Sequence, residues 1–151
     1  MRALGIDYGD ARVGIAITDA LGFTAQGLET IHHHGNDKLV LKRLDEILEK
    51  YDIDTIVLGM PFNMNGTAAE RVEVTKQFRH KLECKYNKIK IETIDERLTT
   101  VAAHKTMNFL EVDKHKKRNI VDTISAVYIL ETYMAKKENQ KKQELRNKKN
   151  D

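Results

Sequence analysis

Asp7 is the residue of this 151-residue chain whose position most directly suggests chemistry, because it interrupts an otherwise apolar stretch. It follows Ile6, and residues 11–18 resume an apolar, β-branched run, so residues 2–18 predict a hairpin with an acid on its first strand. An unpaired buried carboxylate costs roughly several kcal/mol unless a cation or hydrogen bonds compensate it. Arg12 is one candidate for that cation, which would make Asp7 structural, and a metal or phosphate site is the other interpretation.

Two further groups of acids lie where an α/β architecture would bring them near this hairpin. Asp95 and Glu96 follow directly on a predicted strand, and α/β sheets usually carry their sites at strand ends. Asp122 lies near the start of a predicted helix that is apolar on nearly all sides, so we expect its carboxylate to pack against the sheet. Each acid also has an ordinary explanation, which is pairing with Arg97 for the first two and a helix N-terminus for Asp122. Gathered carboxylates repel one another, and a hard divalent cation relieves that repulsion.

The periodicity of the apolar residues predicts the elements that position these acids. Strands are expected at 2–9, 11–18, 23–31, 55–59 and 89–94, and helices at 37–51, 67–86, about 99–109 and 120–134. Asn36 or Asp37 is expected to cap the first helix, and Thr99 or Thr100 the third. Asn119 is expected to cap the last helix, after a polar loop. This order predicts an α/β domain with a mixed β-sheet flanked by α-helices.

Composition limits the class of protein. A chain with 40% hydrophobic and 32% charged residues fits a globular domain of this length. No apolar run approaches a membrane span, and the first residues contain no export signal. The single cysteine, Cys84, cannot form an internal disulfide. We therefore expect a cytoplasmic protein without a membrane partner.

The positive charge is concentrated at the C-terminus. Residues 136–151 contain seven Lys/Arg and three acids, a net charge of +4, so the other 135 residues carry −1 of the total of +3. We expect one domain over residues 1–135 and a basic tail, flexible or helical, over residues 136–151. The tail is either a phosphate-seeking arm or a solubilising end. A second basic cluster, residues 114–118, lies inside the body.

Four motifs between about residues 2 and 134 allow a comparison with known families. They are Gly5-Ile-Asp-Tyr-Gly-Asp-Ala-Arg-Val-Gly-Ile-Ala-Ile-Thr-Asp19, Val57-Leu-Gly-Met-Pro-Phe-Asn-Met-Asn-Gly66, Asp95-Glu-Arg-Leu-Thr-Thr100, and Val121-Asp122 with Ala126 and Ile129-Leu130. Together, and in this order, they resemble the YqgF family, whose members are described as Holliday junction resolvases or pre-16S rRNA nucleases.

The resemblance implies a ribonuclease H-like fold and a cytoplasmic nuclease that hydrolyses phosphodiester bonds, in the 5′-end maturation of the 16S ribosomal RNA precursor. It implies Asp7, Glu96 and Asp122 as the catalytic, metal-binding acids, with Asp95 as the alternative to Glu96. The cofactor would be Mg²⁺ or Mn²⁺. In two-metal hydrolysis, ions about 3.5–4 Å apart activate the water and stabilise the leaving oxygen.

Several cations are candidates for contact with substrate phosphates. They are Arg12, Arg97, Lys116, Lys117 and Arg118, the last three in an expected loop. The expected partner is pre-ribosomal RNA, and the chain is expected to be a monomer or weak homodimer.

Other functions stay open from the sequence. Related junction resolvases carry a second aspartate where this chain has Ser125, which weakens a resolvase-like action on DNA without excluding it. A non-catalytic RNA-binding ribosome-assembly factor is a further alternative. An actin-like ATPase is disfavoured, since the glycine-rich opening motif is not repeated. A metal site at His32-His33-His34 is also disfavoured, because adjacent strand residues point to opposite faces.

Overall fold

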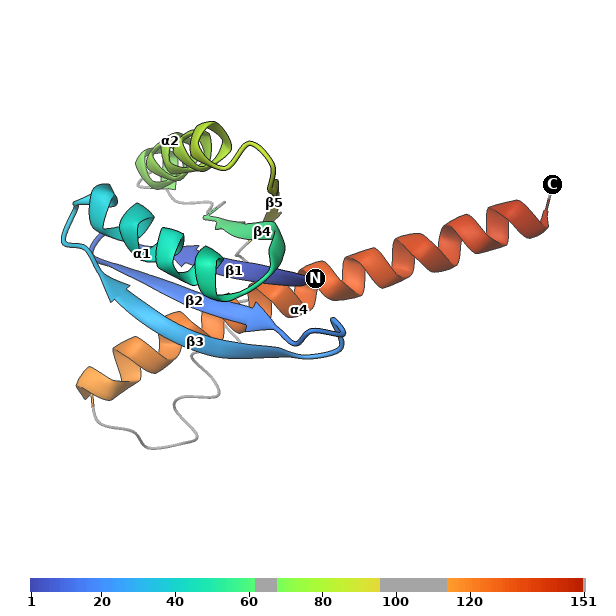
Figure 1. Cartoon of the computed structure of the whole chain (residues 1–151), viewed down its shortest axis with the longest axis horizontal. Coiled ribbons are helices and arrows are strands. Elements are labelled where there is room, and N and C mark those ends of the chain that lie inside the picture. The colour runs from blue at the N-terminus through green and yellow to red at the C-terminus, as the bar shows by residue number, and fades with distance from the viewer. Residues whose placement is uncertain (62–67, 96–113, 151) are drawn as a thin grey trace.

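The computed structural model of the chain describes residues 1–61, 68–95 and 114–150, with the backbone alone for residues 68 and 114–121. Its elements are β1 (Arg2–Tyr8), β2 (Arg12–Thr18), β3 (Ala25–His32), α1 (Asp37–Lys50), β4 (Ile53–Met60), α2 (Ala68–Lys85), β5 (Lys90–Asp95) and α4 (Lys114–Lys149) (Figure 1). Within the described residues, no helix has the length and apolar character needed to cross a membrane.

The five strands form one mixed sheet in the order β3-β2-β1-β4-β5. β1 and β2 form the predicted antiparallel hairpin, in which Asp7 is in register with Gly14. β4 runs parallel to both β1 and β5, as its short apolar run predicts for a strand buried on both faces. The carboxyl ends of β1, β4 and β5 therefore lie at one edge of the sheet. We call this the carboxyl edge.

The two faces of the sheet carry different helices (Figure 1). Leu4, Ile6 and Tyr8 of β1 pack in a cluster with buried residues of α1 and α2, among them Leu44 and Phe78. Side chains alternate along a strand, so Ala3, Gly5 and Asp7 face the opposite side, which α4 covers. That side holds a smaller cluster, made of Ala16, Val57, Ile94, Ala126, Ile129, Leu130 and Tyr133.

Three glycines allow α4 to approach the sheet closely. A Cβ atom at Gly5 would lie 2.6 Å from Cγ of Leu130, and one at Gly27 would lie 2.1 Å from Cγ2 of Thr123. At Gly14 the contact is with backbone, since a Cβ there would lie 2.0 Å from the carbonyl oxygen of Asp122. The glycines are thus needed for space, and the tightest contact fixes the turn of α4 that carries Asp122.

The boundaries of the last helix differ from those expected. Asn119 was predicted as its N-cap, but α4 begins at Lys114, so Asn119 lies inside the helix and the prediction is wrong. Residues 114–118, expected as a loop, form its first turns. The helix also continues to Lys149, because the segment has no Gly or Pro to stop it and is rich in Lys, Gln, Glu and Arg, which propagate helices well.

The other elements lie close to their predicted ranges. Asn36 caps α1, accepting a hydrogen bond from the backbone N–H of Lys38. β3 is shifted toward the C-terminus by one or two residues relative to the predicted 23–31. The expected helix at 99–109 and its caps lie outside the described residues.

Gly27→Ala and Gly14→Ala test the close approach of α4. We expect both to destabilise the fold, Gly27→Ala by about 1–3 kcal/mol as an overpacking substitution and Gly14→Ala by more, because it meets backbone rather than a side chain. Thr123→Ser removes Cγ2 and keeps the hydroxyl that lies 3.2 Å from Oγ1 of Thr30. It should restore most of the stability of Gly27→Ala and none of that of Gly14→Ala. Urea unfolding of the singles and doubles measures this, and equal rescue of both would contradict the geometry.

Candidate active site

Asp7 and Asp122 come together on the α4 face, near the carboxyl edge of the sheet. Asp7 is the penultimate residue of β1 and lies on the same face as Gly5, against which Leu130 of α4 packs. Its register partner is Gly14, and the backbone of Asp122 rests directly on that glycine. The sheet register and the helix contact therefore bring two acids from opposite ends of the chain to one place.

Arg12 forms an ion pair with Asp122. Its Nε donates to Oδ2 of Asp122 at 2.7 Å, and the two side chains are 31% and 18% exposed. The first residue of β2 thus supplies a cation to the acid on α4. Since a guanidinium has five N–H donors, this bond leaves others of Arg12 for a further anionic group.

The electrostatics of Asp122 reflect its surroundings. Burial raises the pKa of its carboxyl group, and the negative charge of Asp7 raises it further. The hydrogen bond and charge of Arg12, and to a lesser extent His32, act in the opposite direction without reversing the rise in pKa. Folding therefore makes ionisation of Asp122 less favourable than in the unfolded chain, and an added cation beside the two acids would relieve this cost.

Asp95 lies at the carboxyl edge but belongs to the other face. Ile94 packs in the cluster against α4, so the pleat directs its neighbour Asp95 toward the α1 and α2 side. This placement separates Asp95 from Asp7. Glu96 and Arg97 lie outside the described residues.

The remaining predicted site residues are described in part. Lys116, Lys117 and Arg118 lie in the first turns of α4, which lead directly to Asp122, and their side chains lie outside the described set. In the described part of the chain, no group of three His, Cys, Asp or Glu side chains could hold a metal ion. The structure thus brings together two of the three predicted acids and one predicted cation.

His33 stabilises the turn next to the candidate site through contacts with backbone groups, a role that the sequence did not indicate. It is 2% exposed, its Nδ1 accepts from the backbone N–H of Gly35 at 3.0 Å, and its Nε2 lies 2.8 Å from the carbonyl oxygen of Gly9. Because Nδ1 is an acceptor, Nε2 carries the hydrogen and donates to Gly9. The ring also stacks on Tyr8 at 5.6 Å. His33 therefore holds the turn that follows Asp7.

The same end of β1 is fixed on the α1 and α2 side. The hydroxyl of Tyr8 donates to Oδ1 of Asp37 at 2.5 Å, and Lys81 bonds the other oxygen of that carboxylate at 2.8 Å. Burial and the bond to Asp37 raise the pKa of Tyr8, so its hydroxyl stays protonated. Arg71 of α2 donates to the carbonyl oxygen of Tyr8 at 3.4 Å, which places one more cation at the carboxyl edge. No motif in the sequence had pointed to Arg71.

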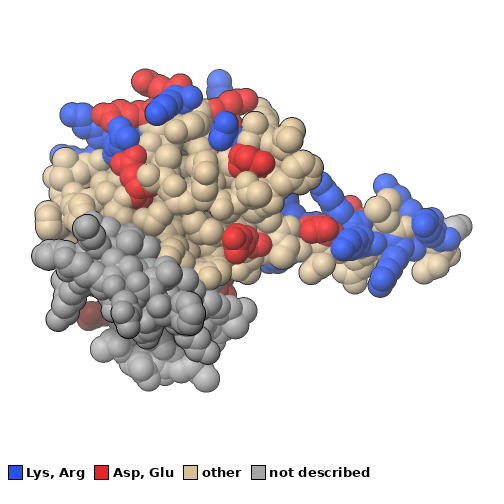
Figure 2. All heavy atoms as spheres, turned by 90° about the horizontal axis from the view of Figure 1, so that it is seen from below, with Lys and Arg blue, Asp and Glu red and all other residues tan. Residues whose placement is uncertain are grey.

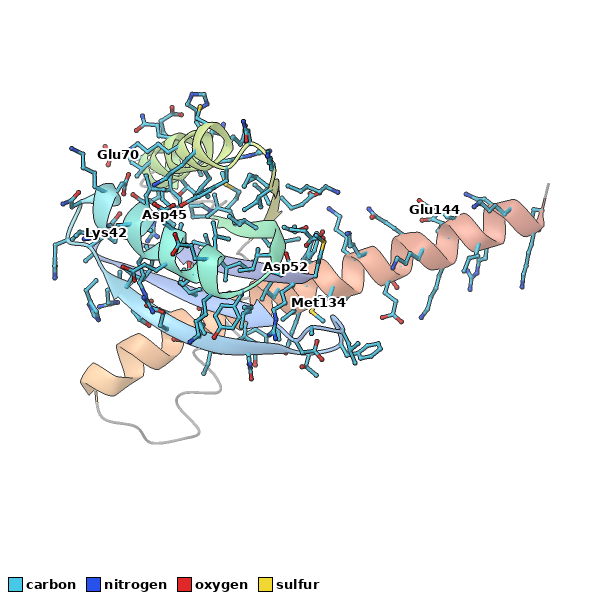
Figure 3. All side chains as sticks on the ribbon, viewed as in Figure 1. Lys42, Asp45, Asp52, Glu70, Met134 and Glu144 are labelled. Carbon is cyan, nitrogen blue, oxygen red and sulfur yellow. The ribbon has the colours of Figure 1, made fainter. Side chains whose placement is uncertain are left out.

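A groove on the described surface lies away from these acids. This groove of about 1000 Å³ runs between the β2–β3 turn and α4, near the N-terminus of β1, and its lining includes Met1, Phe23 and Met134. Met134 marks the place where α4 leaves the body (Figure 3). Neither Asp7 nor Asp122 lines this groove. The acids, and not the groove, define the candidate site.

Comparison with known sequences finds similar proteins. Residues 1–136 match the RuvX family, which is described as Holliday junction resolvase. A protein of Acetivibrio thermocellus named "Putative pre-16S rRNA nuclease" is 49% identical over 137 residues, covering 91% of this chain and 97% of its own. A protein of the same name from Ruminiclostridium cellulolyticum is 51% identical over 134 residues, covering 89% and 94%.

Comparison with solved structures identifies the fold. The fowlpox virus Holliday junction resolvase matches with a TM-score of 0.54 and 13% identity, over 90% of this chain and 99% of its own. T. thermophilus RuvC in complex with a Holliday junction substrate matches with a TM-score of 0.52 and 13% identity, over 85% and 91%. The predicted ribonuclease H-like fold, a mixed sheet flanked by helices, is confirmed.

Asp122→Asn tests the electrostatics of the site. A pKa raised by folding means that ionisation of Asp122 costs stability as the pH rises through that pKa. The neutral amide keeps an acceptor for Arg12, so in chelator at pH 7 we expect a higher melting temperature than for the wild type. About 1 kcal/mol corresponds to roughly 2–4 °C for a domain of this size. The difference should vanish below about pH 4, where both side chains are neutral.

Asp52→Asn, at an exposed position outside the site, is the matched control and should leave melting unchanged at both pH values. Calorimetry in EDTA compares each of the two variants with the wild type at pH 7 and at pH 3.5. A lower melting temperature for Asp122→Asn at pH 7 would show that the Arg12 ion pair outweighs the cost of burial.

Proposed function

This chain belongs to the RuvX family, and from that premise we propose that it is a metal-dependent nuclease acting in the 5′-end maturation of the 16S ribosomal RNA precursor. The reaction is hydrolysis of a phosphodiester bond. The proposed substrate is pre-ribosomal RNA in the cytoplasm, and the acting form is a monomer or weak homodimer. The nuclease domain spans residues 1–135, and the basic tail spans residues 136–151.

The convergence of Asp7 and Asp122 carries this proposal. Their approach depends on the register of the β1–β2 hairpin and on the seat of α4 on Gly14. A fold needs no second acid at this place for its stability, since burial and mutual repulsion make the ionised pair unfavourable. Chemistry that uses carboxylate oxygens provides a reason for the arrangement.

The donor set fits Mg²⁺ or Mn²⁺. Both ions prefer oxygen ligands, and the described acids are two carboxylates with no sulfur or imidazole group required. We assign Asp7, Asp122 and Glu96 as the metal-holding acids, with Glu96 preferred to Asp95 because Asp95 belongs to the opposite face. A metal pair bound there would activate water and stabilise the leaving oxygen of the phosphodiester.

The cations near the site orient the substrate by binding its phosphates. Arg12 binds Asp122 through Nε and retains donors for a phosphate oxygen, so it can hold the acid and the strand at once. We assign the same phosphate-binding role to Arg97 and to Lys116, Lys117 and Arg118, which precede Asp122 in chain order. His33 keeps Gly9 in place and so maintains the turn between Asp7 and Arg12.

A resolvase-like action on four-way DNA junctions is the second candidate, and the family description favours it. Ser125 counts against it. Its side chain is 1% exposed, and in the described part of the chain its Oγ has no hydrogen-bond partner. An enclosed hydroxyl replaces the further carboxylate that related resolvases carry at that position. RNA is therefore the preferred substrate.

Asp7→Asn tests the nuclease assignment. We expect cleavage to fall by more than about 100-fold, since even residues that only support metal ligands cost 10–100-fold when removed. In EDTA the variant should melt above the wild type, because one repelling charge is gone. With Mg²⁺ the order should reverse, because the wild type alone gains about 2.7 kcal/mol of stability at an ion concentration 100 times its Kd. Cleavage gels and melting curves provide the two readouts.

Asp10→Asn is the matched control, an exposed acid of the same hairpin that should keep activity and the response to Mg²⁺. The substrates are labelled RNA with the precursor 5′ extension, single-stranded DNA and a four-way junction. Cleavage of the junction alone would replace the RNA assignment by the resolvase. Metal-independent RNA binding without cleavage would identify an assembly factor, and a destabilised, metal-indifferent Asp7→Asn would mean that Asp7 is structural.

A further inference from the structure

The last 14 residues of α4 lie beyond the family match, except for Lys136, at which the match ends. The match to the RuvX family ends at residue 136, while α4 continues to Lys149. Residues 136–149 contain seven Lys/Arg and two Glu, and the chain up to residue 135 has a net charge of −1. The net positive charge of the molecule therefore comes from this extension.

This extension is a free helix in solvent. The last buried residue of α4 is Tyr133, and residues 135–150 are all exposed. Figure 1 shows the helix leaving the body and running away from the sheet, and Figure 3 shows Glu144 on this outer part. We call residues 136–149 the basic arm.

The charges of the basic arm are available for a partner. Among its described side chains, the one ion pair is Lys142 with Glu138 at 3.5 Å, a solvent-exposed pair of the kind worth about 0–1 kcal/mol. Lys137 lies over the ring of Tyr133. Figure 2 shows the Lys and Arg side chains crowded along the arm. Self-repulsion of such a helix is relieved when a polyanion binds it.

Six of the seven cations of the basic arm lie in two rows along the helix, and Lys136 lies on a third side. At 3.6 residues per turn, one row is Lys137, Lys141 and Lys148, and the other is Lys142, Arg146 and Lys149. The third side also carries the amides Asn139, Gln143 and Asn147. Cation rows flanking polar side chains suit the phosphates and sugars of a nucleic-acid backbone, which are contacted without regard to sequence.

The arm lies far from the candidate active site. Asp122 and Lys149 are on one continuous helix, and at 1.5 Å per residue the axial distance between them is about 40 Å. A duplex of that length spans about 12 base pairs and carries on the order of 24 phosphates. A substrate that reaches both places must be long and structured, whereas a tetranucleotide can occupy only one.

We propose that the basic arm is a second nucleic-acid contact, which binds the phosphate backbone of a long structured RNA about 20–40 Å along α4 from Asp122. The proposal rests on the proposed nuclease function, which it deepens by naming the substrate class. The arm adds affinity for folded, extended RNA and leaves the chemistry at Asp7 unchanged. A short single strand gains nothing from it.

Two matched variants of the full chain test this proposal. The arm variant is K141Q/R146Q/K148Q/K149Q, and the body variant is K38Q/K42Q/K76Q/K88Q at exposed positions of α1, α2 and the turn before β5. Each lowers the net charge by four, and Gln is close to Lys and Arg in helix propensity. Circular dichroism checks that α4 stays helical. Binding of a 20-base-pair RNA hairpin is measured by fluorescence anisotropy against KCl concentration, and cleavage of a tetranucleotide is measured in Mn²⁺.

For the hairpin, we expect the log–log salt slope of the arm variant to fall by up to about 3, at roughly 0.7–0.9 for each phosphate that the arm no longer neutralises. The body variant should keep the slope of the wild type, and all three proteins should cleave the tetranucleotide equally. An unchanged slope in the arm variant would overturn the proposal, as would an equal fall in both variants. So would a loss of self-association in the arm variant, measured by sedimentation, with RNA binding intact.

The test of the basic arm can fail or succeed independently of the test of the nuclease assignment. Asp7→Asn keeps the arm, so it should bind the hairpin with the wild-type slope and fail to cleave. If no protein cleaves any substrate, the nuclease assignment fails, while the difference in slope between the arm and body variants still decides the role of the arm.

Discussion

The close packing of α4 on the sheet is the constraint on which the rest of the structure depends. Ordinary side chains keep a helix at a distance from the strands on which it packs, and here glycines 5, 14 and 27 remove those side chains where the helix passes. The carbonyl group of Asp122 occupies the space that a Cβ atom of Gly14 would need. Because Asp7 is the register partner of Gly14, the contact that builds the smaller cluster also sets the position of one acid relative to the other. Packing and the candidate site are therefore a single arrangement.

In this arrangement a cation offsets part of the cost of bringing the acids together. Asp122 is mostly buried beside a second carboxylate, which raises its pKa, and Arg12 offsets part of that cost through a 2.7 Å bond. Arg12 begins the strand that follows the turn after Asp7, so the hairpin carries both an acid and a counter-charge for the acid on α4. A partly exposed guanidinium can rotate away or bind a second anion, whereas a buried cation would lock the site closed. The Arg12–Asp122 pair thus stabilises the buried acid and still leaves the site accessible to a second anion.

The sequence predicted the sheet better than the ends of the last helix. The apolar, β-branched runs of β1 and β2 and the short apolar run of β4 predicted their strands, because strands that are buried in a sheet are built from such residues. Asp7 and Asp122 stood out because each interrupts an apolar pattern. Asn119 was misplaced as a cap because capping is a local preference, while helix propagation through Lys, Glu and Gln continues wherever nothing stops it. The pairing of Arg12 with Asp122 joins residues far apart in the chain, and His33 works through backbone groups, so neither leaves a pattern in the sequence.

The alternation of β1 links the two faces of the sheet through neighbouring residues. Asp7 faces α4, while Tyr8 faces α1 and α2, where it bonds Asp37 and stacks on Phe78 at 4.2 Å and on His33. A strand end would otherwise fray, but these contacts hold the last residue of β1 and the Gly9 turn from behind. Since adjacent residues share one backbone, any movement of Tyr8 moves Asp7 as well. The core on one face therefore stabilises the geometry of the acids on the other, and substitutions at Tyr8 or His33 act on the site without touching it.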